Sequence, residues 1–305
     1  MDITPRLTLR SHLFRQAVRW FVVPCISGTA PVVQRRARLE WTMRLARLPM
    51  PAGTRVEAAS FRGVPGEWVR NTRVAPRRTV LYLHGGAYAI GSPAVYREYM
   101  AQLALHWQAQ IAIIDYRLAP EHPFPAALDD AIASYQSLLE SGIAADRIVV
   151  AGDSAGGGLT LACALKAREL GLPLPAALAV VAPWVDMTVS GESAQQKTRD
   201  DMLFTDRIRA AATDYLGGAA PTTPLASPLH ADLRGLPPTL IQVTDTEILY
   251  SDALRLDAAL REAGVRSDLR VWKGLWHVWP LFAGKLPEAT DSVLEAAAFL
   301  DGIAG

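Results

Sequence analysis

The chain has 305 residues, of which half are hydrophobic and a fifth are charged, and its formal net charge is +1. This composition excludes a disordered, collagen-like or coiled-coil protein and supplies enough apolar residues for a large core. The charge is unevenly distributed, because residues 1–78 contain fifteen Arg and only four acidic residues, whereas the rest of the chain is net acidic. The roles proposed for the N-terminal segment have to account for this asymmetry.

Cysteine and histidine residues are few and widely spaced. Cys25 and Cys163 form no disulfide framework, and a chain of this length needs none, so they indicate reduced thiols in a cytoplasmic protein. The six His residues are not paired at the short intervals typical of metal ligands, so no metal site is predicted.

An apolar run at residues 20–26 is the only candidate membrane segment near the N-terminus. It contains Pro24 and is too short to span a bilayer, and Arg15 and Arg19 precede it. We therefore expect neither a signal peptide nor a transmembrane helix. The alternative is a basic amphipathic arm that rests on an anionic membrane surface.

From about residue 54, short apolar runs alternate with longer helical patterns. Most of these runs are apolar at nearly every position, which is typical of strands that are buried on both faces of a sheet. The first two runs alternate more and flank a turn at residues 63–66 (GVPG), so they predict an antiparallel hairpin. The predicted strands are residues 55–60, 68–73, 79–83, 111–116, 147–152, 177–182, 239–244 and 268–273.

Helical patterns separate most of these strands. The predicted helices are residues 93–107, 125–141, 155–170, 206–216, 251–263 and 287–301. This alternation predicts an α/β fold with a doubly wound, mostly parallel sheet. Two stretches depart from it: residues 1–50 are helical and precede the sheet, and residues 185–225 are longer than a crossover needs. An excess of this kind is typical of a functional segment such as a lid.

The strongest local motif is Gly152-Asp153-Ser154-Ala155-Gly156, which follows a predicted strand and opens a predicted helix. G-x-S-x-G in this context is a nucleophile elbow, a sharp turn that exposes the serine hydroxyl at the carboxyl edge of the sheet. The glycines avoid collisions with the neighbouring strand and helix. The motif alone is weak, and an ordinary capped turn is the alternative.

A second motif, His84-Gly85-Gly86, directly follows the third predicted strand. A tetrahedral oxyanion needs preorganised N–H donors, and glycines let the backbone approach an acyl group closely. HGG at this place is typical of the oxyanion loop of lipases and esterases. The predicted donors are the N–H groups of Gly85, Gly86 and Ala155, and His84 is predicted to brace the loop.

The base and the acid follow the serine along the chain in folds with this elbow. His277, in a loop after the last predicted strand, is the predicted general base. Asp245, Glu247 and Asp252 follow the preceding strand, and the acid has to accept a hydrogen bond from the imidazole. Asp245 lies closest to the strand end, whereas Asp252 suits the first turn of the next helix. The residues alone leave the acid open.

Together these motifs resemble those of the bacterial hormone-sensitive-lipase-like (family IV) carboxylesterases, a branch of the α/β-hydrolase superfamily. The resemblance also rests on YRLAPE at residues 116–121, APWVD at residues 182–186 and WH at residues 276–277, and it spans roughly residues 55–300. It implies an eight-stranded, mostly parallel sheet with helices on both faces and a helical cap. The cap would comprise residues 1–50 and 185–225, and the hydrolase core residues 51–184 and 226–305.

The resemblance also favours one acid. The family acid lies about thirty residues before the His, which points to Glu247, although the chain has Glu247-Ile248-Leu249 where Asp-Pro-Leu is commoner. Ala87 replaces a frequent third Gly of the oxyanion loop. Asp153 is expected to act as a hydrogen-bonding brace. Arg117 and Glu121 are expected to be structural and to tie the loop by buried ion pairing.

The implied activity is hydrolysis of short- to medium-chain carboxylic esters through an acyl-enzyme, with no metal or organic cofactor. The implied walls of the substrate pocket are Tyr88, Trp184, Leu203, Phe204 and Trp279. The same chemistry serves amide, lactone or carbamate hydrolases, and a non-catalytic receptor of this fold is a further alternative.

The basic N-terminal segment favours an internal role over a nucleic-acid partner, because it contains no recognised binding module. We expect it to form part of a basic cap that lies against the acidic body and gates an apolar pocket. Weak contact with a membrane surface is the alternative, and the family resemblance implies a homodimer.

Overall fold

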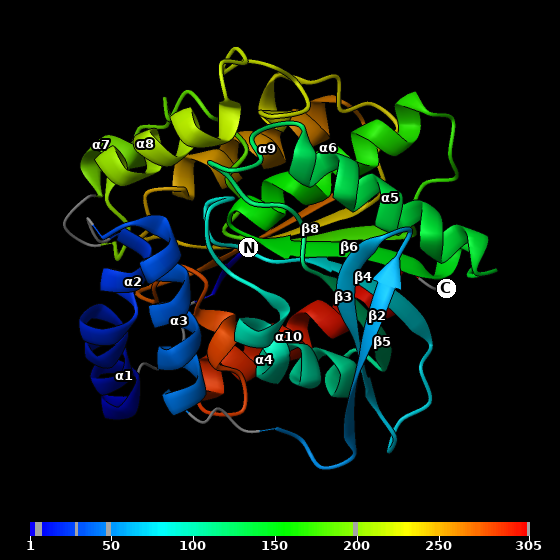
Figure 1. Cartoon of the computed structure of the whole chain (residues 1–305), viewed down its shortest axis with the longest axis horizontal. Coiled ribbons are helices and arrows are strands. Elements are labelled where there is room, and N and C mark those ends of the chain that lie inside the picture. Colours follow the sequence, from blue (N-terminus) through cyan, green and yellow to red (C-terminus); the bar gives the residue numbers. More distant parts are fainter. Residues whose placement is uncertain (4–7, 28–29, 47–49, 198–200, 304–305) are drawn as a thin grey trace.

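The structure is a computed structural model that describes residues 1–3, 8–27, 30–46, 50–197 and 201–303. Its centre is a nine-stranded sheet with the order β1-β9-β8-β7-β6-β4-β5-β3-β2 (Figure 1). Strands β4 to β9 and β1 pair in parallel, whereas β3 is antiparallel to both β2 and β5. The predicted α/β fold class is confirmed.

The strands are β1 (Asp2–Ile3), β2 (Thr54–Phe61), β3 (Val64–Asn71), β4 (Arg78–Leu83), β5 (Ala109–Ile114), β6 (Ile148–Asp153), β7 (Ala177–Val181), β8 (Thr239–Thr244) and β9 (Ser267–Trp272). The expected number was eight, and β1 is the addition. Its two residues pair with Val271 and Trp272 at the edge of the sheet. A strand of two residues is too short to produce a hydrophobic pattern in the sequence.

The α-helices are α1 (Leu9–Phe21), α2 (Val23–Ser27), α3 (Val32–Ala46), α4 (Pro93–His106), α5 (Ala126–Glu140), α6 (Ala155–Glu169), α7 (Ser193–Gln196), α8 (Thr205–Leu216), α9 (Tyr250–Glu262) and α10 (Pro287–Asp301). Helices α5, α6 and α9 cover one face of the sheet, and α4 and α10 cover the other (Figure 1). The chain therefore forms three layers.

The two faces of the sheet explain why the predicted strands are apolar at nearly every position. In β4, Leu81 and Leu83 belong to the core on the side of α5 and α6, whereas Val80 and Tyr82 belong to the core on the side of α4 and α10. All four side chains are buried. Because β4, β6, β8 and β9 are parallel, the loops that follow them meet at one edge of the sheet.

The predicted hairpin between the first two long strands is present, but its turn is shorter than expected. Strand β3 begins at Val64, so only Arg62 and Gly63 connect β2 to β3. Both have positive φ, 52° and 88°. A two-residue turn of this kind matches the right-handed twist of paired strands, so part of the predicted GVPG turn joins the strand instead.

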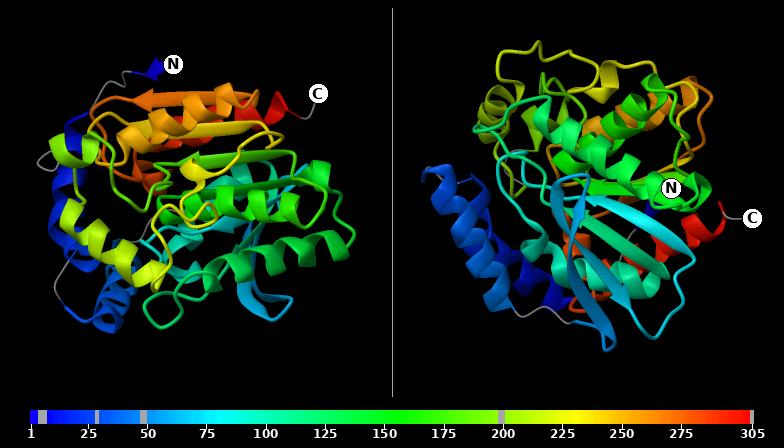
Figure 2. Two further views of the ribbon diagram at one scale, coloured as in Figure 1. Left: turned by 90° about the horizontal axis from the view of Figure 1, so that it is seen from above. Right: turned by 45° about the vertical axis from the view of Figure 1, so that its right-hand side comes forward.

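Helices α1 to α3, which we call the N-terminal helices, lie beside residues 185–225, which we call the insert. Figure 2 shows α1–α3, in blue, next to α7 and α8, in yellow-green, at one end of the molecule. Within the described ranges, no helix has the length and apolar character needed to cross a membrane. Residues 4–7, 28–29 and 47–49 of the first predicted stretch, and residues 198–200 of the second, lie outside the described residues.

Candidate active site

Ser154 stands at the junction between β6 and α6. Its φ of 52° and ψ of −120° form a backbone conformation that L-residues rarely adopt and that is often kept at functional sites. The turn is held by hydrogen bonds from Ser154 N–H to Val181 O at 2.8 Å and from Trp184 N–H to Ser154 O at 2.9 Å. The serine therefore lies at the carboxyl edge of the sheet and at a helix N-terminus, where negative charge is favoured.

The close approach of β6, α6 and β4 explains the glycines of the elbow. A Cβ atom at Gly156 would lie 1.9 Å from the carbonyl oxygen of Leu83, which is impossible without moving the backbone. A Cβ atom at Gly152 would lie 2.4 Å from the carbonyl oxygen of Gly156. Both glycines are therefore needed for the packing that the sequence motif indicates.

Asp153 is buried beneath the loop that follows β4. Its carboxylate accepts hydrogen bonds from the hydroxyls of Tyr82 and Tyr96, both at 2.9 Å, and from Gly85 N–H at 3.1 Å. Burial raises the pKa of Asp153 to about 6, although these donors and His277 act in the opposite direction. These contacts agree with the expected role of a brace.

His277 and Glu247 form a buried pair. His277 Nδ1 donates to Glu247 Oε2 at 2.5 Å, and Glu247 Oε1 accepts from Thr244 N–H at 2.9 Å. Burial alone would lower the pKa of His277, but the Glu247 carboxylate, with further help from Asp201 and Asp153, raises it above its ordinary value. The bond places a proton on Nδ1, so Nε2 of the neutral ring carries the lone pair.

The other two candidate acids have other partners. Asp245 Oδ1 accepts from Gly274 N–H at 2.8 Å. Asp252 lies in the first turn of α9, as predicted, and its Oδ2 accepts from Val185 N–H at 3.2 Å. Of the three carboxylates, the structure therefore brings Glu247 against the imidazole.

The structure corrects the predicted oxyanion donors. The N–H group of Gly85 is bonded to Tyr96 Oη at 3.0 Å and to the carboxylate of Asp153, so it points into the protein. Gly85 is required for a different reason, because a Cβ atom there would lie 2.2 Å from an oxygen of Asp153. Among the described residues, the amides of Gly86 and Ala87 have no hydrogen-bond partner. Both residues have positive φ, 119° and 55°.

His84 is buried behind this loop and acts as a brace. Its Nδ1 is 2.8 Å from the carbonyl oxygen of Gly85, and its ring stacks on Tyr116 with a centroid distance of 4.3 Å. The hydroxyl of Tyr116 donates to the carbonyl oxygen of His84 at 2.7 Å. Burial lowers the pKa of His84 to about 4, so the ring is neutral at physiological pH.

The expected buried ion pairing of Arg117 and Glu121 is wrong. Arg117 pairs with Asp130 of α5 and Glu121 pairs with Arg36 of α3, each at 2.7 Å, and both pairs are partly exposed. The loop between them directs the two side chains to different elements. Arg36 also donates to the carbonyl oxygen of Ala89 at 2.7 Å, so it connects α3 to the loop after β4.

An apolar cavity of about 100 Å³ lies between these loops, and both Ser154 and His277 line it. The N-terminal helices, the insert and the loops after β4 and β9 supply the other walls. Side chains of the N-terminal helices and the insert in this lining include Val18, Leu39, Met43, Met202, Leu203 and Ile208.

Four of the five predicted wall residues lie elsewhere. Leu203 lines the cavity as expected, but Tyr88, Trp184 and Trp279 are fully buried in the protein core. Phe204 is 49% exposed and lines a separate surface hollow. The sequence predicted that the N-terminal segment belongs to a cap over the pocket, but it did not predict which side chains of these helices line the cavity.

The comparisons with known proteins agree with this geometry. A family model described as alpha/beta hydrolase fold matches residues 80–281. The putative acetyl-hydrolase LipR of Mycobacterium tuberculosis is 36% identical over 97% of this chain and 96% of its own length. A crystal structure of an esterase from the bacterial hormone-sensitive lipase family, 37% identical, has a TM-score of 0.93 and covers 99% of this chain and all of its own. The chain belongs to this esterase family of α/β hydrolases.

Membership in the hormone-sensitive-lipase-like family makes the protein a carboxylic ester hydrolase, which confirms the predicted enzyme class. An acetyl-hydrolase of Streptomyces hygroscopicus is 45% identical over 77% of this chain and 78% of its own length. An esterase of Acinetobacter venetianus is 34% identical over 84% of this chain and 85% of its own. The relatives that this chain resembles are thus named as esterases and acetyl-hydrolases.

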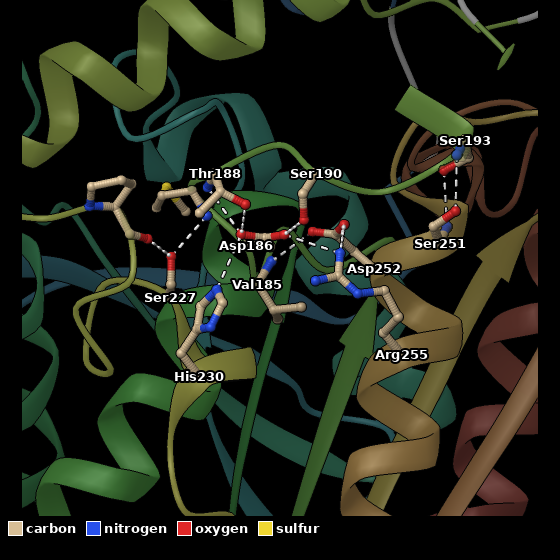
Figure 3. Close-up of polar contacts among 12 residues, drawn as sticks. Val185, Asp186, Thr188, Ser190, Ser193, Ser227, His230, Ser251, Asp252 and Arg255 are labelled. Carbon is tan, nitrogen blue, oxygen red and sulfur yellow. Dashed lines mark hydrogen bonds and ion pairs between the residues drawn. The ribbon is translucent and has the colours of Figure 1, made fainter. Parts of the chain in front are cut away.

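A second polar cluster lies beside the site in this esterase. Figure 3 shows buried Asp186, which accepts from the hydroxyls of Thr188 at 2.5 Å and Ser190 at 2.6 Å and from Arg255 Nη1 at 3.0 Å. Burial opposes ionisation, but these donors hold the pKa of Asp186 well below its usual range. Burial and the charge of Asp186 raise the pKa of Asp252 to about 7.

The cysteines lie away from the cavity lining. Cys25 and Cys163 are both buried and free. Burial raises the pKa of the Cys163 thiol to about 12 and keeps it protonated. In the part of the chain that the structure describes, no three His, Cys, Asp or Glu side chains are grouped so that they could hold a metal ion.

Proposed function

We propose that this esterase cleaves short-chain esters with Ser154 as nucleophile, His277 as general base and Glu247 as the acid. The observation that carries this proposal is the buried Glu247–His277 hydrogen bond at a cavity that Ser154 also lines. His277 takes the hydroxyl proton as Ser154 attacks the carbonyl carbon, and then gives it to the leaving alcohol. Water attacks the acyl-enzyme in the same way. Glu247 orients the ring and stabilises the imidazolium.

The oxyanion of the tetrahedral intermediate would be bound by backbone amides. We propose Gly86, Ala87 and Ala155 as the donors, because the amide of Gly85 is bonded to Asp153. Ala155 is the first residue of α6, so its N–H group has no partner within the helix. The dipole of α6 adds to the attraction for the oxyanion.

The cavity favours short acyl groups. Its volume of about 100 Å³ is smaller than the roughly 150 Å³ of an engineered apolar cavity that binds benzene. We therefore propose acyl chains of about two to four carbons, the shorter part of the range expected from the sequence. Two relatives are named acetyl-hydrolases, and a related crystal structure was soaked with p-nitrophenyl butyrate.

The cap is part of the same proposal. We expected residues 1–50 and 185–225 to form the cap and residues 51–184 and 226–305 the hydrolase core. Strand β1 belongs to the core sheet, so the cap would comprise the N-terminal helices and the insert, which both contribute walls to the cavity. The acyl chain would then lie between the cap and the two catalytic loops. Removal of water from this space would strengthen the electrostatic interactions with the transition state.

The nucleophile is tested by Ser154→Ala with p-nitrophenyl acetate, butyrate, octanoate and an anilide of butyrate. We expect kcat on the esters to fall by about 10⁴-fold or more. The matched control Ser141→Ala, at an exposed position after α5, should behave as the wild type. Normal turnover by Ser154→Ala would refute the proposal. If the wild type cleaved the anilide faster than the butyrate ester, the proposed substrate class would be amides instead of esters.

The acid is tested by Glu247→Gln beside Asp245→Asn. We expect Glu247→Gln to lower kcat by about 10⁴-fold, because an amide cannot hold the imidazole tautomer or stabilise its charge. Asp245→Asn removes only an acceptor for Gly274 N–H, so kcat should stay within about tenfold. If Asp245→Asn lost more kcat than Glu247→Gln while both variants stayed folded, the catalytic acid would be Asp245.

We also propose weak contact of the N-terminal helices with an anionic membrane surface. Trp20 on α1 and Trp41 on α3 are 75% and 64% exposed, and Leu13 and Leu45 are exposed on the same helices. Because the opposite sides of both helices face the cavity, these side chains point outward. The two helices carry seven Arg and one Glu. Arg36 is paired with Glu121, and the helices remain net cationic beside their exposed apolar side chains, as in helices that lie at lipid interfaces. A second copy would place like charges together.

Vesicle binding tests this contact. The protein should sediment with vesicles in which about a third of the lipid is anionic phosphatidylserine. This binding should weaken at about 0.5 M salt and should be lost in the double variant Trp20→Ser/Trp41→Ser. The control is Phe204→Ser, an exposed aromatic of the insert. Equal binding to neutral vesicles, or a stable dimer that the double variant dissociates, would contradict the proposal.

A further inference from the structure

The loop that carries Glu247 is bonded to the loop that carries His277. The carboxylate of Asp245 accepts from Gly274 N–H at 2.8 Å, and Thr246 Oγ1 donates to the carbonyl oxygen of Leu275 at 2.5 Å. These bonds position one side of the acid loop. They join the loops that follow β8 and β9 and do not involve the insert.

The other side of the acid loop is held by the insert, through Ile248. This residue directly follows Glu247, and both its backbone polar groups have partners in the insert. Ile248 N–H donates to Oδ2 of Asp201 at 2.6 Å, and its carbonyl oxygen accepts from Ser193 Oγ at 2.6 Å. Ile248 is fully buried, and Asp201 and Ser193 are only 3% and 1% exposed, so water does not compete for these bonds.

Ser193 makes a second connection at the start of α9. Its N–H group donates to Ser251 Oγ, and its own Oγ accepts from Ser251 N–H, both at 2.9 Å (Figure 3). The insert thus holds the acid loop one residue and four residues beyond Glu247. A shift of this contact would move the carboxylate relative to the imidazole.

We infer that Ser193 and Asp201 are positioning residues that hold Glu247 in line with His277, so that the alignment of the catalytic residues depends on the placement of the insert. This inference rests on the proposed function. Movement of the insert away from the cavity would break the bonds to Ile248 and loosen the acid. Catalytic competence would then be coupled to closure of the same segment that supplies Leu203 to the acyl cavity.

Asp201 contributes a charge as well as a bond. Three carboxylates act on His277, namely Glu247, Asp201 and Asp153. Burial raises the pKa of Asp201 to about 6. The positive charge of His277 acts to lower this pKa, whereas the negative charge of Glu247 raises it further. Above that pH, Asp201 is ionised and favours the imidazolium. Ser193 has no charge. Variants of Ser193 therefore test the positioning of Glu247 alone, whereas variants of Asp201 also test the effect of its charge on His277.

The experiment compares Ser193→Ala with Asp201→Asn. Ser193→Ala removes the donor to Ile248 and should lower kcat about tenfold, the effect of one buried hydrogen bond, while KM stays within twofold. Its pH profile should keep the wild-type acid limb. Asp201→Asn keeps an acceptor oxygen but removes the charge, so the acid limb of kcat/KM should move to lower pH by about half a unit or more.

Matched controls come from the same insert. Thr222→Ala and Asp206→Asn replace exposed side chains and should match the wild type in kcat and pH profile. If Ser193→Ala does not fold, Ser251→Ala removes one bond of the same contact and should lower kcat in the same direction. Rates are normalised to the folded fraction measured by circular dichroism.

The outcomes separate this inference from the proposed function. Unchanged kcat in Ser193→Ala together with an unshifted acid limb in Asp201→Asn would overturn it, even if Ser154→Ala is inactive. A rise of KM alone would also overturn it, because it would place both residues in substrate binding. An active Ser154→Ala would instead refute the proposed function itself.

Discussion

Asp252→Asn is expected to stabilise the protein at neutral and alkaline pH. Asp252 and Asp186 are both buried and both lie near Arg255, whose Nη1 is 3.0 Å from Asp186 but 3.8 Å from Asp252 (Figure 3). The guanidinium therefore compensates Asp186 better. The second carboxylate is left with a repulsive neighbour and two backbone donors, the N–H groups of Val185 and Asp186.

The size of the effect follows from the pKa of Asp252, which burial and Asp186 raise from 3.8 to about 7. At about 1.4 kcal/mol per pKa unit, this difference corresponds to about 4 kcal/mol of unfolding free energy. The folded-state pKa lies above the unfolded value, so the stabilising protonated form is fully present below about pH 4 and is lost as the pH rises through 7. An Asn side chain resembles the protonated form at every pH.

The assay is urea unfolding of wild type and Asp252→Asn, followed by tryptophan fluorescence at several pH values from 4 to 9. The difference in unfolding free energy should be near zero at pH 4, should grow through pH 7 and should level off above it. Asp291→Asn, at an exposed position of α10, is the control and should show no such trend. A variant that is less stable at pH 8, or a difference that does not change with pH, would refute the reasoning.

Three further predictions concern the site. Gly156→Ala should give little folded or active enzyme in a solubility and esterase assay, because its Cβ would lie 1.9 Å from Leu83 O. Tyr116→Phe should lower the unfolding free energy by about 1–3 kcal/mol and lower kcat, because it removes the donor to buried His84 O; equal stability and rate would contradict this. Leu203→Trp should reduce kcat/KM for butyrate more than for acetate esters, and an unchanged ratio would place the acyl chain elsewhere.

The sequence predicted best where a residue type is fixed by local backbone geometry. The elbow around Ser154 needs glycine for contacts that the structure shows, and a strand and a helix flank it on either side. The order of the motifs along a parallel sheet brings the loops after β4, β6, β8 and β9 to one edge. The residues alone left the acid open, and only the family resemblance favoured Glu247, the carboxylate that contacts the imidazole.

The prediction was poorer where the answer depends on tertiary contacts. The glycines of the HGG motif suggested Gly85 as an oxyanion donor, but Gly85 is small because Asp153 lies against it, and its amide is used there. Ala87 was noted only as a replacement for a frequent third Gly and was not among the predicted donors, although in the described residues its positive φ accompanies an unbonded amide. The aromatic residue Trp184 was predicted to line the pocket, but it fills the core, since large apolar side chains serve either purpose.

Apolar contacts accompany the uneven charge where the N-terminal helices meet the cavity. The attraction between a basic cap and an acidic body stays a prediction, whereas the N-terminal helices contact the cavity through apolar side chains such as Val18 and Leu39. Arg36 adds a paired, partly exposed contact to Glu121. Burial of apolar surface depends little on moderate salt, whereas exposed ion pairs and membrane contact are screened. Raising the salt concentration should therefore release the enzyme from anionic vesicles before it weakens the packing of these helices over the cavity.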